Sequence, residues 1–140
     1  MVNIEDVLPH RKPFLYVDAI EEAVSYEYAK GYYVVKEDEF WIPGHFPSNP
    51  VFPGVLLLEI MAQVGGFVFI NKENKSENFA YLTKVDNLKF TRKVSVGDRI
   101  DIVAKFVREF ANYAEVSVIA RVKDKKVASC NITYTFLERL

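Results

Sequence analysis

Apolar and polar residues alternate through the last third of the chain, and this alternation predicts an antiparallel sheet. Every second residue is apolar in residues 100–106, 114–120 and 128–136. A period of two, repeated in consecutive segments, is typical of strands that bury one face. In the predicted strand 80–94 the apolar phase slips near Asp86-Asn87. The slip indicates a β-bulge, because one extra residue keeps both halves of the strand facing the core.

Residues 51–70 have a different pattern, which predicts a helix around which the rest of the chain is organised. Glu59 is their single ionisable side chain. Pro53 suits the first helical turn, where its missing N–H costs nothing. Apolar residues on every side predict a helix that is buried all round. A membrane span needs about 20 uncharged apolar residues, so the prolines, the glycine pair, Gln63 and Glu59 make membrane insertion improbable.

Two further strands complete the predicted fold. Residues 14–24 and 28–35 are rich in β-branched and aromatic side chains and predict a hairpin. Six strands and one apolar helix favour an α+β fold, in which a curved six-stranded antiparallel sheet wraps around one long central helix. The sequence has no internal repeat and no linker, so residues 1–140 are predicted to form a single domain.

Composition and charge narrow the possible partners. Of the 140 residues, 50% are hydrophobic, and the formal net charge is −1. No global field favours nucleic acid, so an acidic partner would need a local basic patch. The single cysteine, Cys130, is interpreted as core packing, and the absence of a second one fits a reducing compartment. Because the N-terminus carries Glu5 and Asp6 and lacks an apolar signal core, we expect a cytoplasmic protein.

Glu59 is the first candidate for chemistry. An ionised carboxylate in an apolar helix is costly to desolvate, so we expect the group to be neutral, paired, or both. In one interpretation it forms a polar seam with Gln63, one helical turn further along. In the other it works with His45, at the end of a proline-rich loop, as an acid/base pair that moves two protons. The residues alone leave both interpretations open.

Several short motifs are distributed along the chain: His45-Phe46-Pro47, Pro53-Gly54-Val55, Glu59, Ala62-Gln63, Leu8-Pro9-His10-Arg11, Pro13-Phe14-Leu15, Val17-Asp18, Phe90-Thr91-Arg92-Lys93-Val94 and Val96-Gly97-Asp98. These motifs resemble those of the 3-hydroxyacyl-acyl-carrier-protein dehydratases of the FabZ type, which act in fatty-acid biosynthesis. The most specific of them lie in the central block, and the resemblance covers nearly the whole chain.

The resemblance implies the hotdog fold and the reversible dehydration of a (3R)-3-hydroxyacyl thioester to the trans-2-enoyl thioester. It implies His45 as the base, Glu59 as the acid, and Gly54, with Val55, as the position that binds the substrate carbonyl. Phe46 is placed in the same substrate-binding set, where it would help to fix the histidine loop, although simple core packing is the favoured alternative for this ring. No cofactor is implied, and the spacing of the two histidines makes a metal site improbable.

The resemblance also implies partners. The family builds homodimers, and often homohexamers that are trimers of dimers, with the active site at the dimer interface and with histidine and glutamate from different subunits. The substrate is carried by an acidic acyl-carrier protein, and no nucleic acid or membrane is expected. Candidate docking residues for the carrier are Arg92, Lys93 and Arg99, with Lys84 and Lys89 nearby in the sequence. Candidates for lining the acyl tunnel, which are equally candidates for the core, are Val55, Leu58, Phe67 and Phe90.

The chain departs from the family pattern at Lys12, Ser48, Phe52 and Ile60. None of these positions is His45, Gly54 or Glu59, so the departures leave the reaction intact and put chain-length preference and tunnel gating in doubt. Three rival interpretations stand beside the dehydratase: a hotdog acyl thioesterase, a non-catalytic acyl-binding hotdog protein, and an isomerising dehydratase. The last of these normally has aspartate at the position of Glu59.

Overall fold

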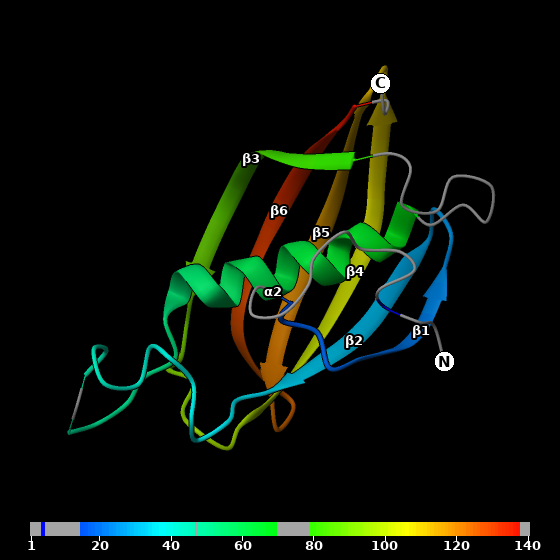
Figure 1. The fold of residues 1–140 in the computed structure, drawn as a ribbon. Helices are drawn as coiled ribbons and strands as arrows, with labels where there is room; N and C mark the ends of the chain where they lie inside the picture. The colour runs from blue at the N-terminus through cyan, green and yellow to red at the C-terminus, as the bar shows by residue number, and fades with distance from the viewer. Residues whose placement is uncertain (1–3, 5–14, 47, 70–78, 138–140) are drawn as a thin grey trace.

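A computed structural model describes residues 4, 15–46, 48–69 and 79–137. It contains one long helix that lies across one face of a six-stranded sheet (Figure 1). The elements are β1 (Ala19–Val24), β2 (Tyr28–Val34), α2 (Gly54–Gly66), the 3₁₀ turn η1 (Phe67–Phe69), β3 (Phe79–Phe90), β4 (Arg99–Phe110), β5 (Tyr113–Val122) and β6 (Lys125–Leu137).

The sheet is antiparallel throughout, and its strand order is β1-β2-β4-β5-β6-β3. This arrangement, with six strands and one long helix among the described residues, confirms the predicted α+β fold. It leaves β1 and β3 at the two edges of the sheet. Figure 1 shows β3 changing direction part of the way along its length. No helix in the described part of the chain is long and apolar enough to span a membrane.

The alternating rows form the core, as predicted. The inward-facing residues of β4, β5 and β6 are mostly buried against α2, and Cys130 is among them. Burial raises the pKa of the Cys130 thiol to about 11, which is consistent with a packing role rather than a nucleophilic one. The predicted bulge is confirmed: the pairing of β3 with β6 shifts between Asp86 and Lys89, and Asn87 has a φ of 55°.

Tyr134 and Gly65 set the distance between α2 and the sheet. The Tyr134 hydroxyl donates to the Ala62 carbonyl at 2.6 Å. A Cβ on Gly65 would collide with that hydroxyl and would lie 3.2 Å from Val116 Cγ2. Glycine is therefore required for this close approach of helix and sheet.

Two predictions about the elements were wrong in part. The helix is not buried all round, because Val55 is 77% exposed, whereas Leu57, Ile60 and Met61 are buried on the side that faces the sheet. The strands are shorter than the predicted 14–24 and 80–94, since β1 begins at Ala19 and β3 ends at Phe90. After β3 the chain leaves the sheet, and the Val94 carbonyl accepts a hydrogen bond from the Phe52 amide at 2.7 Å.

Candidate active site

His45 lies on a loop between β2 and α2 that a carboxylate anchors from within. Glu39 accepts hydrogen bonds from the Lys36 amide at 2.5 Å and from the Trp41 indole N–H at 2.8 Å. The buried Trp41 ring packs edge-on against Phe52, with the ring centroids 5.4 Å apart. The Trp41 carbonyl then accepts the His45 amide at 2.9 Å. Sequence reasoning missed this anchor, although a glutamate two residues before a tryptophan in a charged connector was a visible signal.

The imidazole of His45 is held in one tautomer. Its Nδ1 lies 2.8 Å from the Val51 carbonyl oxygen. A carbonyl only accepts, so we assign the proton to Nδ1, which leaves the lone pair of Nε2 available as a base. Phe46 is 55% exposed, and its ring stacks on the imidazole with the centroids 4.4 Å apart. The favoured core-packing interpretation of Phe46 is therefore wrong, because the ring packs on the histidine.

A cleft of about 430 Å³ opens beside the imidazole, where α2 begins. Gly54 is the first residue of α2, and no side chain in the described part of the chain caps this helix end. The backbone amides of Gly54 and Val55 belong to the positive end of the helix dipole. The residues that line the cleft are His45, Val51, Phe52, Gly54, Leu57, Phe90, Thr91, Arg92, Lys93 and Val94.

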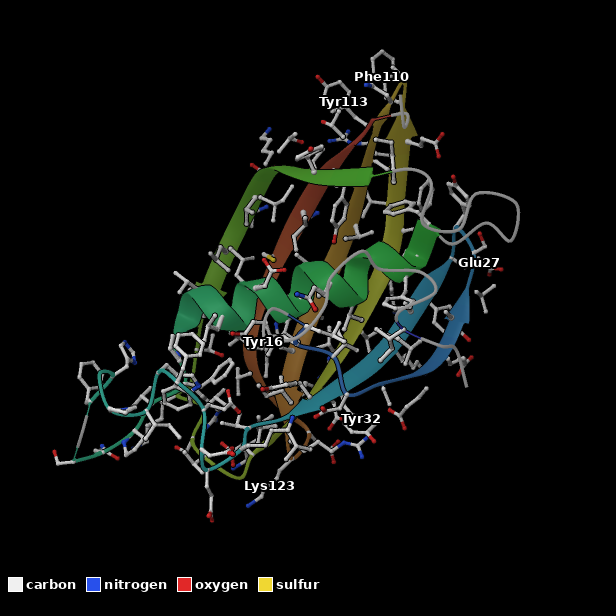
Figure 2. The ribbon with its side chains drawn as sticks, viewed as in Figure 1. Tyr16, Glu27, Tyr32, Phe110, Tyr113 and Lys123 are labelled. Atoms are coloured by element: carbon white, nitrogen blue, oxygen red, sulfur yellow. The ribbon has the colours of Figure 1, made fainter. Side chains whose placement is uncertain are left out.

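Glu59 lies one turn further along α2, in a seam of side chains. Gln63, which is 1% exposed, donates from Nε2 to Glu59 Oε2 at 2.8 Å. Gln63 Oε1 accepts the backbone N–H of Tyr16 at 2.9 Å. Figure 2 shows Tyr16 beside the helix. Gln63 thus does two things at once: it orients the carboxyl group of Glu59, and it ties the segment that enters β1 to the central helix.

The structure brings some of the predicted site residues together and leaves others apart. His45, Gly54, Arg92 and Lys93 all line the cleft, whereas Glu59 is not among the described residues that line it. The candidates for the acyl tunnel also divide. Phe90 is 49% exposed in the cleft, Val55 is exposed, Leu58 is half-buried, and Phe67 is fully buried in the core.

Arg99 lies at the start of β4, separated from β3 in the sheet order by β5 and β6. Its guanidinium donates to Asp101 at 2.9 Å and to Glu21 at 3.2 Å, and it lies over the Tyr32 ring at 3.8 Å. The pKa of Arg99 is raised, first by its hydrogen bond to Asp101. Its contacts therefore lie on the β1–β2–β4 side of the sheet and not in the cleft of His45.

Two other predictions concern the residues that depart from the family pattern and the possibility of a metal site. Among the departures from the family pattern, Phe52 packs against Trp41 and is buried, and Ile60 is fully buried on the side of α2 that faces the sheet. Lys12 lies outside the described residues. Ser48 is exposed in the loop of His45. Within the described ranges, no group of three or more histidine, cysteine, aspartate or glutamate side chains could hold a metal ion.

Comparison with known proteins defines the class first. A sheet of this order crossed by one long helix is the hotdog fold. The dehydratase heterocomplex ApeI:P from Xenorhabdus doucetiae shares this fold, with a TM-score of 0.83 at 13% identity over 99% of this chain and 93% of that chain. The family model for the FabA-like domain matches residues 8–131.

Two curated relatives then give the particular family. The 3-hydroxyacyl-acyl-carrier-protein dehydratase FabZ of Bacillus subtilis (strain 168) is 35% identical over 136 residues, which cover 97% of this chain and 96% of the relative. The FabZ of Bartonella henselae (strain ATCC 49882) is 40% identical over 134 residues, covering 95% of this chain and 86% of the relative. The chain therefore belongs to the FabZ-type family of 3-hydroxyacyl-acyl-carrier-protein dehydratases.

Proposed function

We propose that this protein removes water reversibly from (3R)-3-hydroxyacyl-acyl-carrier protein to give the trans-2-enoyl product of fatty-acid biosynthesis. The observation that carries the proposal is the cleft of a FabZ-type chain, where a histidine of fixed tautomer lies beside the start of the central helix. A base and an electropositive helix end in one cleft suit the removal of a proton next to a carbonyl group.

The first half of the reaction uses His45 and the start of α2. Nε2 of His45 takes a proton from C2 of the substrate, and the electron pair of the C–H bond moves toward the thioester carbonyl. The negative charge that grows on the carbonyl oxygen is stabilised by the backbone N–H groups of Gly54 and Val55, assisted by the helix dipole. Gly54 has no side chain to keep the oxygen away from the backbone.

The second half uses Glu59. Its carboxylic acid gives a proton to the 3-hydroxyl group, the C3–O bond breaks, and water leaves as the C2–C3 double bond forms. One proton has moved to the histidine and one has left the glutamic acid, so the return of one proton from His45 to Glu59 through the released water and solvent restores the enzyme for the next turnover. In the hydration direction both transfers run in reverse. Because Gln63 Nε2 donates to Oε2, its hydrogen bond favours Oε1 as the oxygen that carries the acid's proton.

In the proposed enzyme, a second copy of the chain brings the acid to the base. Glu59 does not line the cleft of its own His45 among the described residues. Strand β3 is an edge strand of 12 residues, and an edge of this length is a template for pairing with another strand. Its described side chains include the exposed Tyr81 and Leu82, and Val55 is exposed on α2. We therefore place two active sites at a dimer interface, with histidine and glutamate from different subunits; three such dimers would make a hexamer.

The carrier protein would dock at the mouth of the cleft. Arg92 and Lys93 are exposed and line the same cleft as His45, so an acidic carrier held there would deliver its acyl group to the base. The third predicted cation, Arg99, makes its contacts elsewhere on the sheet. A chain whose single cysteine is free suits a reducing compartment, and we place the activity in the cytoplasm.

A complementation experiment tests the proposal. His45→Ala and Glu59→Gln should each lower turnover of 3-hydroxyacyl-carrier substrate by about 10²–10⁴-fold. After random reassembly of the two variants, turnover should return to about a quarter of the wild-type value, since half of the dimers are mixed and each has one intact site. A mixture of His45→Ala with the double variant is the control and should stay inactive. Full activity of either single variant would refute the assigned roles, and failure to complement would refute the shared site.

A further inference from the structure

Phe90 is the large apolar side chain that the cleft presents to an incoming ligand. Of the other apolar side chains that line the cleft, Phe52, Leu57 and Val94 are 3%, 3% and 2% exposed, and Val51 is half-buried. Phe90 is 49% exposed and lies at the end of β3, the edge strand that pairs with β6. A half-exposed aromatic ring beside a catalytic base is available to contact a substrate.

The bulge in β3 aims this ring at the cleft. Phe90 is paired with Ala128, which is buried on the core face of β6. Between Asp86 and Lys89, β3 contains one residue more than the opposite segment of β6. If the pairing continued from Asp86 without the bulge, Phe90 would lie opposite Val127 instead of Ala128, and its side chain would lie on the other face of the sheet. Bulges next to active sites commonly reorient one side chain in this way.

The ring lies against the backbone at the start of α2. A Cβ built on Gly54 would be 3.0 Å from Phe90 Cζ and 3.2 Å and 3.3 Å from the two Cε atoms. The edge of the ring therefore contacts the glycine whose amide is assigned to the substrate carbonyl. In the same cleft, His45 is assigned to the proton on C2. The ring thus occupies space next to the atoms where C1 and C2 of the acyl group must lie.

We propose that Phe90 is a specificity-determining residue that excludes acyl groups branched at C2. The inference rests on the proposed function, because it needs the substrate carbonyl at Gly54 and C2 at His45. A straight-chain substrate carries hydrogens at C2 that fit beside the ring, whereas a 2-methyl group requires the volume that the ring fills. Removal of the ring opens that volume without changing the base, the acid or the helix start.

The test compares two substrates in the wild type, two Phe90 variants and one control variant. Straight-chain and 2-methyl-branched (3R)-3-hydroxyacyl thioesters of equal length are assayed with wild type, Phe90→Ala and Phe90→Leu, and the ratio of kcat/KM for branched over straight substrate is measured. One methyl group in an apolar pocket is worth roughly 10–200-fold. The ratio should rise at least tenfold in Phe90→Ala and less in Phe90→Leu. Leu88→Ala removes another exposed apolar side chain of β3 and is the control, which should keep the wild-type ratio.

The outcomes separate the inference from the proposed function. If the wild type does not dehydrate the straight substrate, the proposed function fails. If it does, and Phe90→Ala is folded by its thermal transition but keeps the wild-type ratio, only the specificity role of Phe90 is overturned. An equal rise in Phe90→Ala and Leu88→Ala would also overturn it, because the effect would then come from a loosened strand. Phe90→Leu retains an apolar side chain and supplies the same test if the alanine variant does not fold.

Discussion

Replacing Gln63 with methionine separates the orientation of Glu59 from its chemistry. Methionine has a similar length and fills the buried site, but it can neither donate to Glu59 Oε2 nor accept the Tyr16 amide. Tyr16 is 5% exposed, so its N–H would be left buried without this acceptor. Such an orphaned group costs about 1–3 kcal/mol. Glu59 is only half-buried, so water compensates much of the donor that it loses.

The magnitude follows from the size of the chain. For 140 residues, 1 kcal/mol corresponds to roughly 3–4 °C in Tm, so Gln63→Met should lower Tm by about 3–12 °C. Turnover should fall about tenfold, because the carboxylic acid remains but is no longer held in one orientation. Glu59→Gln should behave in the opposite way. Its amide oxygen can still accept from Gln63, so Tm should stay near the wild-type value while turnover falls by at least 10²-fold.

The assay measures Tm at one fixed protein concentration, because association would make Tm depend on concentration, and measures kcat on the same preparations. Tyr134→Phe is the matched control. It removes a different hydrogen bond to α2, at the Ala62 carbonyl, and should lower Tm without changing kcat. A Gln63→Met protein that is destabilised but fully active would show that the seam is structural only. A variant unchanged in both quantities would refute the hydrogen bonds themselves.

Two further predictions concern charges on the surface. Arg92→Glu or Lys93→Glu should weaken the use of carrier-bound substrate. The loss should be largest at low salt, because at physiological salt the Debye length is only about 8–10 Å. Turnover of a small thioester should stay unchanged in these variants, and the control Arg99→Glu should affect neither substrate. Equal losses on both substrates in steady-state assays would contradict a docking role. Glu115 accepts from Asn131 and from Arg108, each at 2.8 Å, and these bonds hold the pKa of its carboxyl group below the usual range. The stability that it contributes is present above the ordinary pKa of an unfolded glutamate and is lost as pH falls through the lower folded pKa. The Tm deficit of Glu115→Gln should therefore be largest near neutral pH and vanish in strong acid. A deficit that does not vary with pH would rule out this linkage.

The features that could be predicted from the sequence are those with a local physical cause. The rows of β4, β5 and β6 follow from period two, since one face of each strand must avoid water. The bulge near Asn87 was visible as a slip in the same period, because a pattern out of phase can be restored only by an extra residue. The start of α2 was marked by Pro53, which is the residue before the first helical one.

Other features depend on what a segment meets in space. An apolar side chain on a helix, such as Val55, predicts that contact with water is unfavourable at that position. The sequence does not show which element or subunit covers it. Residues 91–94 continue a strand-like pattern but leave the sheet, because Val94 is buried against the loop at Phe52. The bond between Gln63 and Tyr16 joins residues 47 positions apart, so local reasoning could propose the seam with Glu59 but not this second partner.

The two assigned catalytic groups are held in different ways, and this difference determines how each can be tuned. His45 is held by main-chain atoms, the carbonyls of Val51 and Trp41, which no single side-chain replacement removes. Glu59 is held by the side chain of Gln63, so one substitution reaches it directly. Changes in the base therefore require changes in the path of its loop, through anchors such as Glu39, and these also affect the packing of Trp41 and Phe52. The orientation of the acid can change on a fixed scaffold, because the helix that carries it is positioned independently by Tyr134 and Gly65.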